Sequence, residues 1–151
     1  MKTKLSVFVL CICSIALLAS CSRGQNKSKA TTETISKPIR ELLSKQYPNA
    51  TILEVDRKKN GTEIDIQEKN IHKEVWFNKS EKWVSTRWKV REQDVPVAIT
   101  DALIHSAYAM YKVEDITAVE KPDGMFYEFE LKQDDNEVRL VFDSKAQIAV
   151  Q

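Results

Sequence analysis

The sequence predicts an α+β fold in which two tandem α-β-β-β-β repeats place their helices on one face of an antiparallel sheet. Each half begins with a proline-initiated segment whose apolar residues recur at helical spacing, after Pro38 and after Pro96. Alternating apolar and polar residues follow each segment, as in strands that bury one face. The apolar positions of the first half recur about 60 residues later, which indicates an internal repeat.

The N-terminus is typical of a secretory signal. Lys2 and Lys4 precede an apolar run over residues 5–18, which is shorter than the ~20 residues of a membrane-spanning helix. Leu18-Ala19-Ser20-Cys21 resembles the lipobox of bacterial lipoproteins, whose cysteine thiol receives a diacylglycerol before cleavage makes that cysteine the new N-terminus. We therefore predict a signal peptide over residues 1–20 and lipidation of Cys21. The alternative is a plain secretory signal with an incidental cysteine.

This assignment accounts for all three cysteines of the chain. Cys11 and Cys13 would leave with the signal, and lipid would occupy Cys21. The mature chain would then hold no free thiol, which excludes disulfides, thiolate nucleophiles and cysteine metal sites. The 23 basic and 22 acidic residues give a net charge of +1, which provides no electrostatic attraction for nucleic acid.

The rest of the chain divides into a tether and two repeats. Residues 21–35 are polar and lack periodicity, which predicts a lipidated flexible tether with a reach of about 20 Å. Ordered packing of this segment against the domain is the alternative. The repeats span residues 36–93 and 94–151. Because each is marginal in size for a stable fold, we expect them to share one structure.

Each repeat begins with a helix that has one apolar stripe. The apolar residues follow the spacing i, i+3, i+4, i+8, which marks a single buried face. They are Ile39, Leu42, Leu43 and Tyr47 in the first helix, and Ile99, Ala102, Leu103 and Ala107 in the second. After the helix the offset between repeats grows to 64 residues, from Tyr47 to Tyr111. Because four extra residues are close to one helical turn, we expect the second helix to be a turn longer.

Alternation predicts about four strands in each half. We expect a hairpin turn at Asn60-Gly61, because both residues accept positive φ, and another at Pro122-Asp123-Gly124. The first half has expected strands near residues 51–57, 62–68, 72–77 and 83–90, and the last two strands of the second half lie near 137–142 and 147–150.

Several short motifs recur together in one known family. They are the prolines before both helices, Tyr47-Pro48-Asn49-Ala50, the pair Ile52 and Val55, Asn60-Gly61, and Val75-Trp76-Phe77-Asn78-Lys79. The chain thereby resembles PepSY-like bacterial lipoproteins over about residues 36–151. The resemblance implies two repeats, a fold similar to the beta-lactamase inhibitor protein, and a non-catalytic binding module of the cell envelope. PepSY domains are associated with protease propeptides, so the resemblance also makes enzyme inhibition an expectation.

The sequence offers little material for catalysis. It contains no phosphate-binding loop, zinc-protease motif or nucleophile elbow. The two histidines, His72 and His105, lie on a predicted strand and a predicted helix, which is a poor basis for acid–base chemistry or a metal site. We expect no enzymatic activity, no metal and no cofactor.

Aromatic and charged residues define a candidate binding face on the side of the sheet away from the helices. If Val75 and Phe77 point toward the helix, Trp76 must point away. Trp83 and Trp88 lie an odd number of residues apart on one predicted strand, so their side chains point to opposite faces. One of them therefore also faces outward unless a bulge intervenes. The candidate face comprises Trp76, Trp83, Trp88, Asp65, Glu74, Glu128 and Arg139. The alternative is that the tryptophans pack between the two halves of the sheet or against the segment that connects them.

The expected ligand of this face is a protein or peptide of the cell envelope, because tryptophan and arginine dominate such interfaces. A glycan or small molecule that stacks on the same aromatic residues is the alternative. Carboxylates such as Glu63, Asp65 and Glu128 suit a cation or a basic peptide, or form a merely solvated sheet face. By analogy with lipoprotein sorting in some bacteria, Ser22 after the lipidated cysteine favours the outer membrane, with the protein facing the periplasm.

The predicted lipidation can be tested in cells. An inhibitor of lipoprotein signal peptidase should make the precursor accumulate, because this enzyme would cleave the chain before Cys21. Immunoblots of treated and untreated cells measure the ratio of precursor to mature protein. A Cys21→Ser variant, which cannot be lipidated, serves as the control and should not respond to the inhibitor. Unchanged processing of the native chain would contradict the prediction.

Overall fold

The structure is a computed structural model that describes residues 35–149. The predicted signal peptide, Cys21 and nearly all of the predicted tether lie outside the described residues. The helices are α1 (Lys37–Gln46), the 3-10 turn η2 (Glu92–Asp94) and α2 (Val97–Ile104). The strands are β1 (Thr51–Lys58), β2 (Gly61–Glu68), β3 (Ile71–Asn78), β4 (Trp83–Lys89), β5 (Lys112–Lys121), β6 (Gly124–Gln133) and β7 (Asn136–Asp143).

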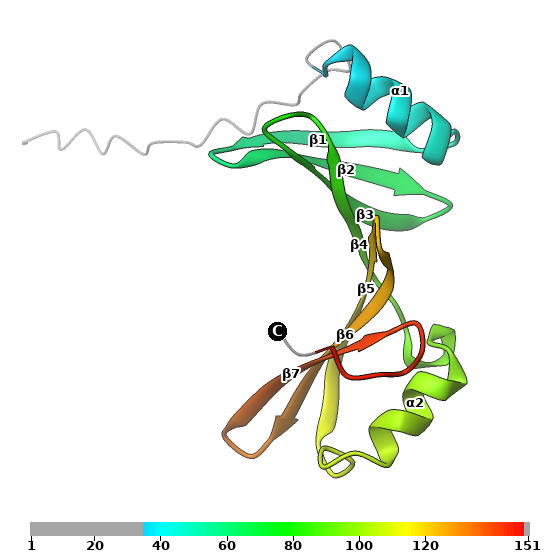
Figure 1. Cartoon of the computed structure of the whole chain (residues 1–151), viewed down its shortest axis with the longest axis vertical. Helices are drawn as coiled ribbons and strands as arrows, with labels where there is room; N and C mark the ends of the chain where they lie inside the picture. The colour runs from blue at the N-terminus through cyan, green and yellow to red at the C-terminus, as the bar shows by residue number, and fades with distance from the viewer. Residues whose placement is uncertain (1–34, 150–151) are drawn as a thin grey trace, which may run out of the picture.

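The strands form one sheet in chain order, β1-β2-β3-β4-β5-β6-β7, and every neighbouring pair is antiparallel. The sheet bends so that α1 and α2 both lie on its outer side (Figure 1). We call this side the helix face and the opposite side the open face. The predicted α+β class, with an antiparallel sheet and helices on one face, is confirmed.

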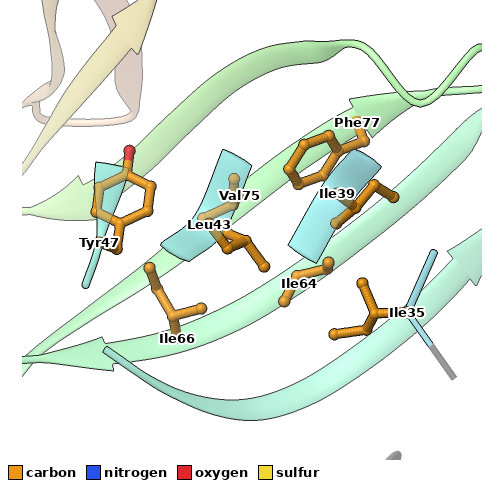
Figure 2. Close-up of a cluster of buried hydrophobic side chains, with 8 residues drawn as sticks. All are labelled: Ile35, Ile39, Leu43, Tyr47, Ile64, Ile66, Val75 and Phe77. Atoms are coloured by element: carbon orange, nitrogen blue, oxygen red, sulfur yellow. The ribbon is translucent and has the colours of Figure 1, made fainter. Parts of the chain in front are cut away.

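The first core lies between α1 and the sheet. Its helix residues repeat at four-residue spacing and its strand residues at two-residue spacing, so both sets point to one interior (Figure 2). The buried residues are Ile35, Ile39, Leu43, Tyr47, Ile64, Ile66, Val75 and Phe77. Ile35 was expected in the tether, but it packs here because it continues the apolar stripe of α1 by one turn.

The second core repeats this arrangement under α2. It is built around Phe129 and Phe142, whose rings meet edge to face with centroids 5.6 Å apart. The buried residues are Val95, Ile99, Leu103, Ile116, Phe129, Leu131, Leu140 and Phe142. Each helix therefore covers its own core, and the two cores belong to one continuous sheet.

The second repeat departs from expectation at both ends. α2 ends at Ile104 instead of gaining a turn, and Ala107 is exposed instead of buried. The hydroxyl of Ser106 donates to the carbonyl of Leu103 at 2.7 Å and accepts from the amide of Tyr108 at 3.0 Å. These side-chain bonds replace the helical pattern, so the four extra residues form turns.

The expected strand over residues 147–150 is reduced to one isolated bridge, between Phe142 and Ile148. The amide of Ala149 also donates to the carbonyl of Val141 at 2.8 Å. This segment therefore touches the outer edge of β7 but adds no eighth strand among the described residues.

Gly61 is needed for a reason that the turn pattern does not reveal. It begins β2, and among the described residues only Gly124 is a glycine with positive φ, at 142°. A Cβ atom at Gly61 would lie 2.0 Å from the carbonyl oxygen of Phe77 on β3. Close approach of two backbones, and not a left-handed turn, excludes a side chain there.

This close approach predicts that Gly61→Ala is destabilising. The added methyl group must push β2 away from Phe77, so we expect a loss of about 2 kcal/mol or more in the free energy of unfolding. Urea denaturation of the mature chain measures the loss. Lys59→Ala, in the exposed turn beside it, is the control and should change stability by less than about 0.5 kcal/mol. Equal effects of the two substitutions would contradict the argument.

Candidate binding face

Trp76 lies on the open face, as its parity predicts. Its neighbours along β3, Val75 and Phe77, are fully buried in the first core, so the indole between them points the other way. Its partners across the strands are Glu63 on β2 and Ser85 on β4. The indole is half-buried, with a small residue on one side and a carboxylate on the other.

Trp83 is not on the open face, which corrects the prediction. A bulge in the β3–β4 pairing places Trp76 opposite Ser85 but Phe77 opposite Trp83. The extra residue reverses the alternation, so Trp83 packs against the first core. Its indole nitrogen donates to the hydroxyl of Thr86 at 3.0 Å.

Trp88 also lies on the helix face, again contrary to the prediction. The Lys73 ammonium nitrogen lies 5.0 Å from the centroid of the Trp88 ring and 5.0 Å from that of Tyr47. Tyr47 ends α1, and its hydroxyl lies 2.7 Å from that of Thr86, two residues before Trp88. Both tryptophans therefore lie on the helix face, Trp83 against the first core and Trp88 beside Tyr47 and Lys73.

Phe126 is an aromatic residue of the open face that the sequence argument missed. It lies on β6 two residues before Glu128, so both side chains leave the same side of the strand. The ammonium of Lys121 lies 4.8 Å from the centroid of its ring. The two-residue spacing from Glu128 could have identified Phe126, since no bulge interrupts the pairing of β6 with β7 between them.

Glu128 is buried at the centre of the open face and holds two arginines. Its side chain is about 6% exposed. Arg87 reaches it from β4 with Nη1 at 3.3 Å and Nη2 at 2.5 Å, and Arg139 donates to it from β7. Burial alone would raise the pKa of Glu128, but the hydrogen bonds and charges of both arginines lower it below its ordinary value. The carboxylate thus ties three strands together.

Asp65 has the opposite environment on the β1–β3 part of the same face. Burial raises its pKa, the carboxylates of Glu74 and Glu54 raise it further, and His72 opposes them. Glu74 is its direct cross-strand partner, and the nearest basic atom is the Nε2 of His72, at 3.7 Å from Oδ2. The other carboxylate oxygen, Oδ1, is buried and accepts no hydrogen bond within residues 35–149.

A hollow of about 130 Å³ lies beside β4 at the middle of the sheet, and it is lined by Trp88 together with the open-face residues His72, Glu74, Arg87, Lys89 and Thr117. In the part of the chain that the structure describes, no group of histidine, cysteine and carboxylate side chains could hold a metal ion. No helix within residues 35–149 is long and apolar enough to cross a membrane.

Solved structures share this architecture. A BLIP-like protein from Bacteroides fragilis is 28% identical, with a TM-score of 0.69, and the match covers 76% of this chain and 83% of the other. A DUF2874 family protein from Bacteroides uniformis is 20% identical with a TM-score of 0.66, covering 76% and 86%. A protein from Bacteroides eggerthii, described as periplasmic, is 20% identical with a TM-score of 0.64, covering 75% and 84%. No curated protein matches the chain.

Within residues 35–149, an antiparallel sheet is backed by helices on one side and left open on the other, and this is the BLIP-like fold of the structures above. A family model described as beta-lactamase-inhibitor-like and PepSY-like matches residues 24–72 and 67–149. The chain belongs to this PepSY-like family, as its motifs indicated.

The contrast between Glu128 and Asp65 predicts opposite effects on stability. Glu128 has a lowered pKa in the folded state, so its contribution is present at neutral pH and is lost as the pH falls through that pKa. Asp65 has a raised pKa in the folded state, so its ionised form destabilises the fold at neutral pH. This destabilisation disappears as the pH falls and the carboxylate is protonated.

Thermal unfolding at pH 7 and at pH 4 measures both effects. At pH 7, Glu128→Gln should lower stability by about 1–3 kcal/mol because a neutral amide with one accepting oxygen replaces the charged acceptor of two arginines. Asp65→Asn should raise the melting temperature at pH 7 and raise it less at pH 4. Glu130→Gln, an exposed neighbour on the same face, should leave the melting temperature nearly unchanged. A lower melting temperature for Asp65→Asn at pH 7 would contradict the assignment.

Proposed function

We propose that this protein is a non-catalytic, lipid-anchored protein of the cell envelope that binds a protein or peptide partner through the open face. The observation that carries the proposal is the placement of both helices on one side of the sheet. The other side is left with a half-buried Trp76 among ordered charged groups. Tryptophan and arginine in such a setting supply much of the binding energy at protein interfaces.

The proposal of a binding role, and not of catalysis, rests on how the polar groups of the face are used. Arg87 and Arg139 are both engaged by Glu128, and Lys89 is engaged by Asp115. Groups held in such pairs fix the shape and charge of a surface. They are not placed as a general acid and a general base beside a substrate cavity. The inhibitor-like description of the family supports the same interpretation. Inhibition of an envelope enzyme is one form that this binding would take.

The proposed anchor is the lipid on Cys21, which lies 14 residues before Ile35. Acyl chains contribute about 0.8 kcal/mol per buried CH₂ group, so a lipidated cysteine would hold the protein at a membrane. The Bacteroides eggerthii protein of similar fold is described as periplasmic, which supports a position facing the periplasm. Ser22 supports delivery to the outer membrane.

Site-specific photo-crosslinking in cells tests the proposed binding face. A photoreactive benzoylphenylalanine in place of Glu63, beside Trp76, should crosslink to a discrete protein of the envelope. The same group in place of Ser44, exposed on α1, is the matched control and should not. Trp76→Ala should abolish the crosslink while preserving the melting temperature within a few degrees.

Other results would overturn this assignment of partner and face. Equal crosslinking from both positions would show that the open face is not selective. No crosslink from position 63, together with quenching of tryptophan fluorescence by an envelope oligosaccharide that Trp76→Ala prevents, would favour the glycan alternative.

A further inference from the structure

Negative charge is concentrated on the β1–β3 part of the open face. Pairing registers place the carboxylates of three adjacent strands side by side there. They are Asp56, Glu63, Asp65 and Glu74. Lys58 lies 2.5 Å from Asp56 and 3.6 Å from Glu63, so one cation serves two of these carboxylates.

The β4–β7 part of the same face is balanced by its own cations. Arg87 and Arg139 bind Glu128, Lys89 binds Asp115, and Lys132 lies 2.9 Å from Glu137. Glu74 lies opposite Arg87, but that guanidinium is held by Glu128, and among the described residues neither Glu74 nor Asp65 makes an ion pair with lysine or arginine. The surplus of negative charge is therefore a property of one half of the face.

The surplus surrounds an aromatic ring. Trp76 follows Glu74 by two residues on β3, so both side chains leave the open face next to each other. Across β2 lie Asp65, opposite Glu74, and Glu63, opposite Trp76. An ammonium or guanidinium group placed here would meet carboxylates and the face of an indole together, the two environments that favour such cations.

The surroundings of Asp65 lack a hydrogen-bond donor for one of its carboxylate oxygens. Its Oδ1 is buried without a hydrogen-bond donor within residues 35–149, and its closest cross-strand neighbour is another carboxylate. A buried acceptor without a donor costs free energy that a bound donor would recover. Within residues 35–149 no group of histidine, cysteine and carboxylate side chains could hold a metal ion, and a lysine or arginine side chain would supply the N–H donors that the Asp65 carboxylate lacks.

We infer that the β1–β3 part of the open face receives a lysine- or arginine-bearing segment of the protein partner. This inference rests on the proposed function and specifies the chemistry of the partner. The basic group would approach Asp65 and Glu74 and lie against Trp76, while the apolar stem of its side chain covers the indole. Electrostatic attraction would also speed association and make it sensitive to salt.

Two matched peptides test the inference on the full mature chain. One peptide alternates lysine with valine, and the other alternates glutamate with valine. Fluorescence titration should show saturable binding of the lysine peptide and none of the glutamate peptide. Glu74→Gln and Asp65→Asn should each weaken the binding of the lysine peptide about tenfold, and added salt should weaken it further. Glu130→Gln, in the balanced half, is the control and should leave it unchanged.

The inference is overturned if neither peptide binds, if both bind equally, or if Glu130→Gln weakens binding as much as Glu74→Gln does. If the crosslink from position 63 persists in the Glu74→Gln variant, these outcomes refute the inference about a basic segment and do not refute the proposed function. If Trp76→Ala abolishes that crosslink and Glu74→Gln does not, the partner is recognised by the indole and not by the carboxylates.

Discussion

The short ladder between β4 and β5 is the constraint on which the rest of the structure depends. It pairs Thr86 with Glu120 at one end and Lys89 with Thr117 at the other, and it joins two halves that each have a separate core. On the helix face, the hydroxyl of Tyr47 contacts both Thr86, at 2.7 Å, and Glu120, at 3.4 Å, so α1 is tied to both strands. Burial raises the pKa of Tyr47 to about 12, which keeps this hydroxyl neutral.

Because the ladder makes one sheet, carboxylates from different repeats share the open face but have different surroundings. Glu128 is held by arginines from strands on either side of it, and its charge contributes to the fold. Asp65 faces Glu74 and Glu54, and its charge works against the fold. Because such a charge lowers the stability of the fold, a role in binding a ligand explains its presence better than a structural role does. This difference separates the structural half of the face from the half that we propose binds a partner.

The comparisons show that this architecture recurs in proteins of quite different sequence. Solved structures that are 20–28% identical share the architecture, so the fold tolerates extensive change in the side chains that cover it. A shared fold alone does not specify a ligand. The groups of this chain from which we argue a ligand are the charged and aromatic side chains of its open face, namely Trp76 and Phe126 with the acidic and the balanced halves around them.

The sequence by itself determined the α+β class, the helix over Ile39 and Leu43, and the outward side of Trp76, because these depend on local periodicity. Only the tertiary structure decided where Trp83 and Trp88 lie, because one bulged residue reverses the alternation and leaves no signal in the local pattern. The same holds for Gly61, because the requirement for glycine at this position comes from the close approach of the neighbouring strand. The ion pairs around Glu128 likewise join β4, β6 and β7, since strand register, and not spacing along the chain, sets which side chains meet.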